Sequence, residues 1–194
     1  HNFIEKTIIA LFQSVSVRSA GFNTADIFGL GTATIFMLIF MMFIGGNTFS
    51  TAGGIKTSTF ALICINTWSI IRGKKKVEVL RRTIPNDDML KAFTVLVTFS
   101  AGMLICIYAL CITEKHILDM PDRGLIDLIF EEVSAFSTCG LSTGVTGMLS
   151  DSGKVILAIS MFIGRLGTLS IIFAFSRKII STNYSYPEEH IMVG

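Results

Sequence analysis

Charged residues are scarce in this sequence. Of its 194 residues, 15% are Asp, Glu, Lys or Arg and 51% are hydrophobic, whereas a soluble domain carries about 25% charge. Two tracts, Ile27 to Ile55 and Ala92 to Thr113, hold no charge over 29 and 22 residues. Because roughly 20 apolar residues span the hydrocarbon core of a bilayer, the sequence predicts an all-α integral membrane protein and argues against a soluble protein with a very apolar core.

The sequence also lacks the residue patterns that metal binding, covalent catalysis and phosphate binding require. The four cysteines show no CxxC spacing and lie in apolar tracts or a polar loop, which favours small buried thiols over a metal site. No Ser-His-Asp, Cys-His or paired-carboxylate constellation is present. The segment Gly53 to Thr57 superficially suggests a phosphate loop but fails the Gly-Lys-Ser/Thr spacing. We therefore expect neither an enzyme nor an organic cofactor.

What the sequence does contain is an internal repeat. Residues 12–24, FQSVSVRSAGFNT, return as residues 130–143, FEEVSAFSTCGLST. The offset is 118 up to Ser16 and Ser134, and it becomes 119 at Gly21 and Gly140 after one inserted residue. The new offset persists to the MFIG segments that end at residues 45 and 164. A register kept over this length favours a duplicated unit, which we call the first and the second copy.

Each copy predicts a short helix followed by a polar loop centred on glycine. The short helices are expected at Glu5 to Val15 and at Leu125 to Ser137, and neither is long enough to cross a bilayer. The polar loops follow at Ser16 to Thr24 and Thr138 to Gly144. Asp26 is expected to cap the long helix that comes next.

The long helix of the first copy is interrupted. Its apolar halves, Ile27 to Ile44 and Thr59 to Ile71, are separated by the glycine- and hydroxyl-rich segment Gly45 to Ser58. Irregular backbone at membrane depth is tolerated where it is buried in protein or lines a wet cavity; a re-entrant turn without function is the alternative. In the second copy the crossing Lys154 to Ser176 carries Arg165 near its centre, which costs at least ~2.5–3.5 kcal/mol unless it is paired or wet. Loop carbonyls are its expected acceptors.

The distribution of charge predicts the orientation. Arg72 to Lys91 holds seven basic and three acidic residues, whereas Thr113 to Leu128 holds two basic and four acidic ones. The positive-inside rule puts the first of these loops and the C-terminus in the cytoplasm, so Met89 to Thr113 crosses outward. A nucleic-acid site is disfavoured because the basic run is short and lies beside a membrane span. The predicted division is a first repeat at 1–73 whose leading helix is missing through a truncated or artificial start, a cytoplasmic linker at 74–88, a complete second repeat at 89–180, and a cytoplasmic tail at 181–194.

Two half-crossing helices, each followed by a polar loop, predict an ion pore. Each half-helix directs its C-terminal end, which carries roughly −0.5 charge, toward the membrane interior, and loop carbonyls can replace the hydration shell of a cation. Arg18, Glu131 and Glu132 flank the loops and are expected to brace them or to face the outer vestibule rather than bind the ion. The expected carbonyl donors are Ser19, Ala20, Gly21 and Phe22 in the first copy and Thr138, Cys139, Gly140 and Leu141 in the second.

These motifs resemble those of the Trk/Ktr/HKT superfamily of potassium transporters. SVSVRSAGFNT followed by GGNTFSTAGGIKTST resembles the third repeat of that family, and FSTCGLSTGVT followed by GRLGTLS resembles the fourth. The closing YSYPEEHIMVG is similar to the C-terminus of a Ktr-type membrane subunit. The resemblance implies a subunit of four helix–pore-loop–helix repeats around one pore, of which this chain matches the last two and lacks the N-terminal half.

The resemblance also implies roles and partners. It assigns K⁺ preference to filter glycines at Gly21 and Gly140 and implies a homodimer that binds a cytoplasmic ring of nucleotide-binding regulatory subunits. Lys56 either reaches for the membrane surface or repels cations when the pore is blocked. The gate residues implied for the intramembrane loop, which Arg165 faces, are Gly45, Gly46, Asn47, Thr48, Ser50, Thr51, Gly53, Gly54 and Lys56.

The sequence predicts a multi-pass protein of the cytoplasmic membrane with a carbonyl filter gated by the intramembrane loop, and the resemblance implies that the translocated ion is potassium. Dependence on Na⁺ is left open, and no metal other than the transported ion is expected. One alternative is an ion-coupled carrier with alternating access, in which interrupted helices also occur. A second alternative is a non-conducting fragment that serves in assembly or anchoring.

Overall fold

The computed structural model describes residues 3–23, 26–48, 50, 52–73, 77–79, 82–120 and 124–166. Within these ranges the chain is helical apart from a small antiparallel pairing of two two-residue strands. The elements in chain order are α1 (Phe3–Ser16), α2 (Thr32–Phe43), α3 (Thr57–Ile71), β1 (Glu78–Val79), β2 (Arg82–Thr83), α4 (Asn86–Thr113), α5 (Lys115–Leu118), α6 (Leu125–Phe136), the 3₁₀ turn η1 (Val145–Met148) and α7 (Asp151–Leu166).

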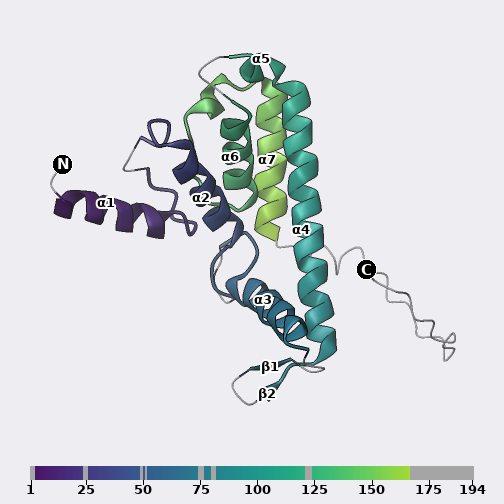
Figure 1. The fold of residues 1–194 in the computed structure, drawn as a ribbon. Coiled ribbons are helices and arrows are strands. Elements are labelled where there is room, and N and C mark those ends of the chain that lie inside the picture. Colours follow the sequence, from purple (N-terminus) through teal and green to yellow (C-terminus); the bar gives the residue numbers. More distant parts are fainter. Residues whose placement is uncertain are drawn as a thin grey trace, which may run out of the picture.

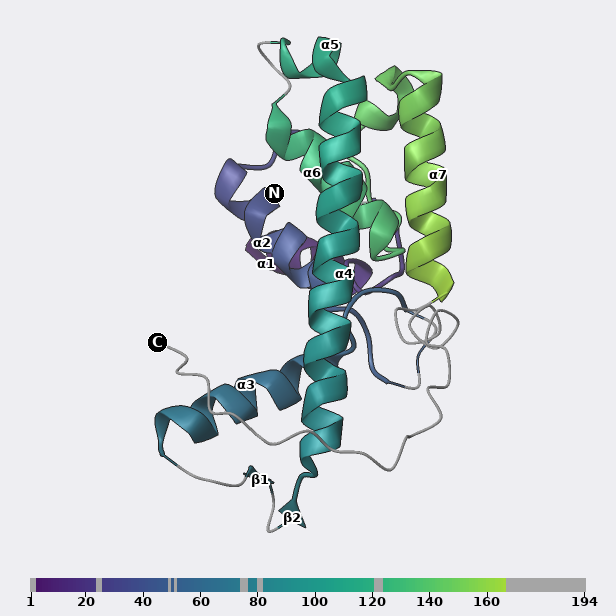
Figure 2. The ribbon, with the colours of Figure 1, turned by 90° about the vertical axis from the view of Figure 1, so that its right-hand side faces the viewer.

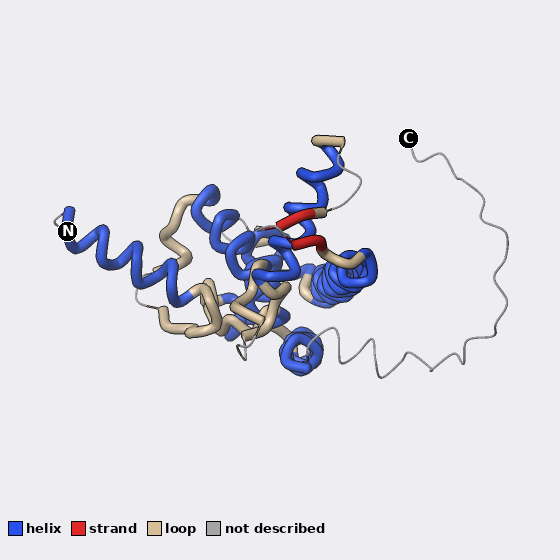
Figure 3. Tube along the Cα trace, turned by 90° about the horizontal axis from the view of Figure 1, so that it is seen from below, coloured by secondary structure: helices blue, strands red, loops and turns tan. Residues whose placement is uncertain are grey.

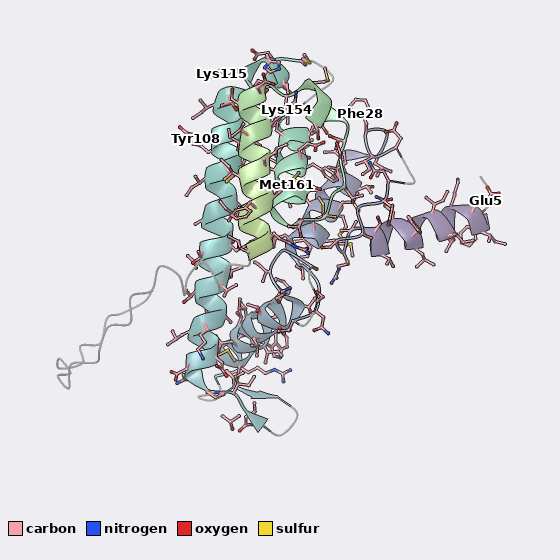
Figure 4. The ribbon with its side chains drawn as sticks, turned by 180° about the vertical axis from the view of Figure 1, so that it is seen from behind. Glu5, Phe28, Tyr108, Lys115, Lys154 and Met161 are labelled. Carbon is pink, nitrogen blue, oxygen red and sulfur yellow. The ribbon has the colours of Figure 1, made fainter. Side chains whose placement is uncertain are left out.

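Helices α4, α6 and α7 lie side by side and form the main bundle (Figures 1 and 2). Helix α4 has 28 residues, which corresponds to about 42 Å, and it is the one described helix that is long and apolar enough to cross a membrane. Asp87 and Asp88 in its first turn suit the positive end of the helix dipole. Tyr108 points outward from α4, away from the bundle (Figure 4).

Helix α6 is the centre of the core. Its residues from Leu128 to Phe136, apart from half-buried Ile129, are all buried, because α2, α4, α7 and η1 all pack against this helix. The end of α6 is held by a chain of edge-to-face aromatic rings, with Phe99 4.9 Å from Phe136 and 5.7 Å from Phe43 between ring centroids. These contacts join the ends of α2 and α6 to the middle of α4.

Helix α1 projects away from the bundle, with Glu5 near its far end (Figures 3 and 4). It buries only Gln13 and Ser16. The following helix α2 packs on α6 instead and buries one face. The large apolar side chains that α1 exposes are Phe3, Ile4, Ile8, Leu11, Phe12 and Val15.

Helix α3 leaves the line of α2 and packs against the N-terminal half of α4, with the β1–β2 pair between their ends (Figure 2). The guanidinium of Arg72, just after α3, lies 4.9 Å from the centroid of the Trp68 ring. An amphipathic Trp at a helix end is typical of a membrane–water interface.

The prediction that Asp26 caps the long helix of the first copy is wrong. That helix begins at Thr32 with Gly31 as its N-cap residue, because Asp26 Oδ1 instead accepts a hydrogen bond from Phe28 N at 3.1 Å and closes a local turn. The helix predicted from residue 27 therefore starts five residues later. Residues 167–176 of the predicted last crossing, the tail at 181–194, gate residue Thr51 and linker residues 74–76, 80 and 81 lie outside the described residues.

Candidate functional site

The loops that follow α1 and α6 share one backbone conformation. Ser19 and Gly21 have φ angles of 67° and 69°, and their counterparts at offset 119, Thr138 and Gly140, have φ angles of 53° and 89°. A left-handed residue is thus followed, two positions on, by a left-handed glycine in both copies. Non-glycine residues adopt this region at a cost, so the shared pattern is a specific feature of the two loops.

The two helix ends that lead into these loops also match. Gly21 N donates to Ser16 O at 3.3 Å, and Cys139 N donates to Ser134 O at 2.9 Å. Each bond spans five residues, as at helix ends that close with a left-handed residue. The C-terminal, negative ends of α1 and α6 therefore lie directly beside the two loops.

Two serines missed by the sequence prediction of the site hold the far sides of the loops. Ser16 Oγ donates to Phe22 O at 2.8 Å, and Ser134 Oγ donates to Leu141 O at 2.5 Å. Phe22 N in turn donates to Ser16 Oγ at 3.0 Å. The two serines are equivalent positions of the repeat, so their recurrence in the sequence was the available signal. Phe22 O and Leu141 O are both predicted ligands of the ion. Each uses one of its two lone pairs to accept the hydrogen bond from a serine hydroxyl.

The structure brings the two predicted filter loops into direct contact. A Cβ atom built on Gly21 would lie 2.8 Å from Cys139 O and 3.4 Å from the Cα of Gly140. Two further bonds join the loops: Asn23 Nδ2 donates to Ser142 O at 3.0 Å and Cys139 Sγ donates to Val17 O at 3.0 Å. Ala20, Phe22 and Gly140 are exposed, whereas Cys139 and Leu141 are buried in the core between α2 and α6.

The glycine-rich segment between α2 and α3 folds back on itself. Gly45 N donates to Ile55 O at 2.8 Å and Ile55 N donates to Phe43 O at 3.1 Å, so the two ends of the loop are paired. Lys56 Nζ donates to Ser50 O at 2.9 Å and to Ala52 O at 2.6 Å. The ammonium group of Lys56 is thus hydrogen-bonded to carbonyl oxygens of the same loop. We call residues 45–56 the intramembrane loop.

The tip of the loop is closed by short-range polar bonds among predicted gate residues and between these and the first turn of α3. Thr48 N donates to Asn47 Oδ1 at 2.7 Å, Ser50 Oγ donates to Asn47 O at 2.8 Å, and the hydroxyls of Thr48 and Ser58 lie 2.5 Å apart. Gly46 O accepts a hydrogen bond from Thr57 N at 3.1 Å. Asn47, Thr48 and Ser50 are exposed, and Gly54 has a left-handed φ of 76°.

The intramembrane loop contacts both filter loops. Gly53 N donates to Thr138 Oγ1 at 3.0 Å, and a Cβ atom on Gly53 would lie 2.5 Å from Ser137 O. On the side of the first copy, Arg18 Nη1 donates to Gly45 O at 3.3 Å. The close approach at position 53 leaves room for glycine alone, and it puts the loop directly against the second filter loop.

Arg165 lies in the last described turn of α7 and is exposed. It lines an open cavity of about 340 Å³ together with Ser134, Ala135, Thr138, Gly140 and Met161. Arg18 and Lys56 donate hydrogen bonds to carbonyl oxygens of the intramembrane loop. Arg165 thus lies beside the second filter loop, and its expected contact with the intramembrane loop stays a prediction.

Glu131 braces the segment after the second filter loop. Its Oε1 accepts hydrogen bonds from Ser142 Oγ at 2.7 Å, Thr143 N at 2.8 Å and Thr143 Oγ1 at 3.1 Å. Its Oε2 accepts one from Thr146 Oγ1 at 2.6 Å. With four donors on a side chain that is 4% exposed, Glu131 has the bracing position expected of it.

Comparison with known proteins identifies the family of this chain. A family described as TrkH, cation transport protein, matches residues 3–186. The chain belongs to the TrkH family. The potassium transporter TrkH from Vibrio parahaemolyticus has the same fold, with a TM-score of 0.70 and 20% sequence identity over 89% of this chain and 38% of that one.

Three curated proteins that are similar to this chain are named as uptake proteins. Ktr system potassium uptake protein D of Bacillus subtilis is 42% identical over 96% of this chain and 40% of its own length. Protein B of the Ktr system in the same organism is 37% identical over 100% of this chain and 42% of its own length. The potassium/sodium uptake protein NtpJ of Enterococcus hirae is 35% identical over 99% of this chain and 42% of its own length. The chain therefore spans about two fifths of the curated relatives it matches.

Membership of the TrkH family confirms the resemblance inferred from the motifs and the prediction of a helical membrane fold. The family consists of transporters, which also confirms the expectation that the chain is not an enzyme. The roles of individual filter and gate residues stay predictions.

Proposed function

We propose that this chain supplies two of the four pore-loop repeats of a potassium uptake subunit, and that backbone carbonyls of its two filter loops replace the hydration shell of K⁺. The relatives named as potassium uptake proteins support the identity of the ion. The loop backbone supports the mechanism, because alternating left-handed residues rotate successive peptide planes so that carbonyl oxygens can face one side.

The observation that carries this proposal is the meeting of equivalent glycines. Gly21 and Gly140 lie at the same position of two repeats, have the same left-handed conformation and contact each other. Each loop also lies at the negative end of a helix, where the dipole of roughly half a charge stabilises a cation. A shared ion pathway requires that equivalent loops lie around a common pore axis, and the contact between Gly21 and Gly140 supports such an arrangement.

The intramembrane loop acts as the gate in this proposal. It is tied to the first filter loop through Arg18 and to the second through Thr138. Lys56 holds the loop closed on its own carbonyls and places a positive charge beside the pathway. A cation on the pathway is repelled by this ammonium until the loop moves.

The rest of the transporter follows from the family resemblance. The chain joins an N-terminal half that carries the other two repeats, and the subunit is a homodimer in the cytoplasmic membrane with a cytoplasmic ring of nucleotide-binding regulatory subunits. Its division is the one expected from the sequence, with repeats at 1–73 and 89–180, a cytoplasmic linker at 74–88 and a cytoplasmic tail at 181–194. Coupling to Na⁺ belongs to the same proposal, supported by the name of the relative NtpJ.

The experiment is uptake of ⁸⁶Rb⁺ into proteoliposomes that contain the full-length subunit. The proposal expects rapid uptake that K⁺ competes with and that substitution of Gly21 abolishes. Slow, saturable exchange would instead indicate an ion-coupled carrier with alternating access. Helices interrupted at the membrane midplane, as α2 and α3 are by the intramembrane loop, also occur in such carriers. No flux from correctly folded full-length protein would leave an assembly role and overturn the proposal.

A further inference from the structure

Within the described part of the chain three glutamates are buried, and they differ in what surrounds them. Glu114, Glu131 and Glu132 are 0%, 4% and 0% exposed. Glu114 accepts bonds from the backbone N–H and the hydroxyl of Ser150 at the start of α7. Glu131 accepts four hydrogen bonds from the segment after the second filter loop. Both are thus surrounded by donors, as ionised carboxylates require.

Glu132 has no such donors. Among the described residues, neither of its carboxyl oxygens has a hydrogen-bond partner, and the hydroxyl of Ser160 beside it has none either. The hydroxyl of Ser160 on α7 and the thiol of Cys106 on α4 are the polar groups beside this carboxyl group. The carboxyl group therefore lies in the apolar interior where α4, α6 and α7 meet.

No charged group of the described residues compensates Glu132. From α4 only Cys106 faces it, and α2 and η1 contain no titratable side chain. The titratable residues of α7 lie in its first turn, at Asp151 and Lys154, and in its last turn, at Arg165, whereas Ser160 faces Glu132. The described ion pairs do not include Glu132.

The repeat shows that a pore helix does not need an acid at this position. The residue equivalent to Glu132 in α1, at an offset of 118, is Ser14. An ionised carboxylate without donors in a membrane-embedded bundle is strongly disfavoured, whereas the neutral acid carries a single O–H that one acceptor satisfies. Ser160 Oγ, itself without a partner among the described residues, is the acceptor at hand.

We propose that the carboxyl group of Glu132 is a proton-binding site, with the proton shared with Ser160. Glu132 lies one turn before the end of α6, and that end leads into Thr138 to Gly140. Loss of the proton adds a negative charge to the negative end of the helix behind the second filter loop. The effect on transport rests on the proposed function, whereas binding of the proton does not.

The direct test is the infrared spectrum of the full-length protein in lipid vesicles. Glu132→Gln is expected to remove a carbonyl-stretch band of a protonated carboxyl group, whereas the matched variant Glu131→Gln is expected to keep it and to remove carboxylate intensity. Ser160→Ala, which keeps the carboxyl group, is expected to shift the band because the O–H loses its acceptor. A protonated band that is unchanged in both Glu132→Gln and Ser160→Ala would overturn the proposal.

The transport test compares initial ⁸⁶Rb⁺ uptake by wild-type protein and Glu132→Gln as the pH is raised. Ionisation of Glu132 is expected to increase the ratio of wild-type to variant rate by roughly two- to fivefold, the range that a charge at a helix end produces. A ratio that stays constant over the pH range contradicts the coupling to the filter. If wild-type protein carries no flux, the proposed function fails while the infrared spectrum still decides whether Glu132 holds the proton.

Discussion

The two copies of the pore-loop motif have the same backbone but very different surroundings. Helix α6 is buried along most of its length by α2, α4 and α7, whereas α1 projects from the bundle and buries two residues. The side chain of Glu131 accepts four hydrogen bonds, whereas the side-chain amide of its repeat equivalent Gln13, also buried, makes none among the described residues. Even so, both loops have a left-handed residue two positions before a left-handed glycine.

This difference separates what the motif encodes from what the rest of the fold adds. The turn itself forms in both copies, so it depends on local features that they share: the serine near the end of the helix and the glycine. Packing and the Glu131 brace are found in the second copy. We therefore expect equivalent substitutions in the turn to have an effect in either copy. Substitution at the Glu131 position should matter in the second copy and not at the equivalent Gln13 in the first.

The largest effect is expected from alanine at the filter glycines of the full-length subunit. In Gly21→Ala the left-handed φ costs about 1–2 kcal/mol, and the new Cβ atom would meet Cys139 O at 2.8 Å. Uptake of ⁸⁶Rb⁺ should fall by at least about tenfold. Gly140→Ala should lose less, since its Cβ atom meets only the Cα of Gly21 at 3.4 Å. The control is Gly147→Ala, where no atom lies within 4 Å of the new Cβ atom.

A second prediction concerns the brace. Glu131→Ala leaves Thr143 N and three hydroxyl groups without their acceptor, and each buried donor costs about 1–3 kcal/mol. We expect a loss of stability on the order of 3 kcal/mol, seen as a lower unfolding temperature in detergent. Gln13→Ala should be nearly neutral by the same assay. Equal destabilisation by the two variants would show that the two copies are braced alike.

The contact of the gate with the second filter loop gives a third prediction. Thr138→Val keeps the shape of the side chain but removes the acceptor of Gly53 N, and a hydrogen bond of this kind is worth about 0.5–1.5 kcal/mol. Release of the intramembrane loop should raise the ⁸⁶Rb⁺ uptake rate severalfold. Thr138→Ser restores the hydroxyl and should bring the rate back toward that of the wild type. A similar rate in the Val and Ser variants would assign the effect to the methyl group instead.

The smallest effect is expected from the two serines that bind the carbonyls after the filter glycines. Ser134→Ala and Ser16→Ala each remove one hydroxyl from equivalent bonds. Because the first copy has no counterpart of the Glu131 hydrogen bonds among the described residues, Ser16→Ala should weaken the preference for Rb⁺ over Na⁺ more than Ser134→Ala. Competition of Na⁺ with ⁸⁶Rb⁺ uptake measures this preference, and the reverse order would contradict the role given to Glu131.

Much of the fold follows from the repeat that the sequence displays. Helix α6 begins at the predicted Leu125 and ends one residue before the predicted end, and α1 differs from its predicted bounds by two residues at the start and one at the end. The predicted break is also present, although α3 begins at Thr57 and so includes the hydroxyl residues Thr57 and Ser58 of the predicted loop. A periodic pattern and its interruptions are local properties, and local properties can be seen in one sequence.

The remaining features depend on residues that are distant in the sequence. The bond between Gly53 and Thr138 joins positions 85 residues apart, and the bond between Asn23 and Ser142 joins positions 119 apart. The start of α2 was missed because the side chain of Asp26 can close a local turn as readily as cap a helix. The repeated serines were visible in the sequence, but their bonds to Phe22 and Leu141 needed the turn geometry.

The central claim is that the two loops face one cation, and the density of a bound ion tests it most directly. A structure of the full-length protein, determined with Rb⁺ or Tl⁺ in place of K⁺, would locate the heavy ion by its scattering. The account predicts an ion between the loops, coordinated by carbonyl oxygens at or next to Gly21 and Gly140. An ion pathway that passes elsewhere, with these carbonyls turned away from it, would contradict the account.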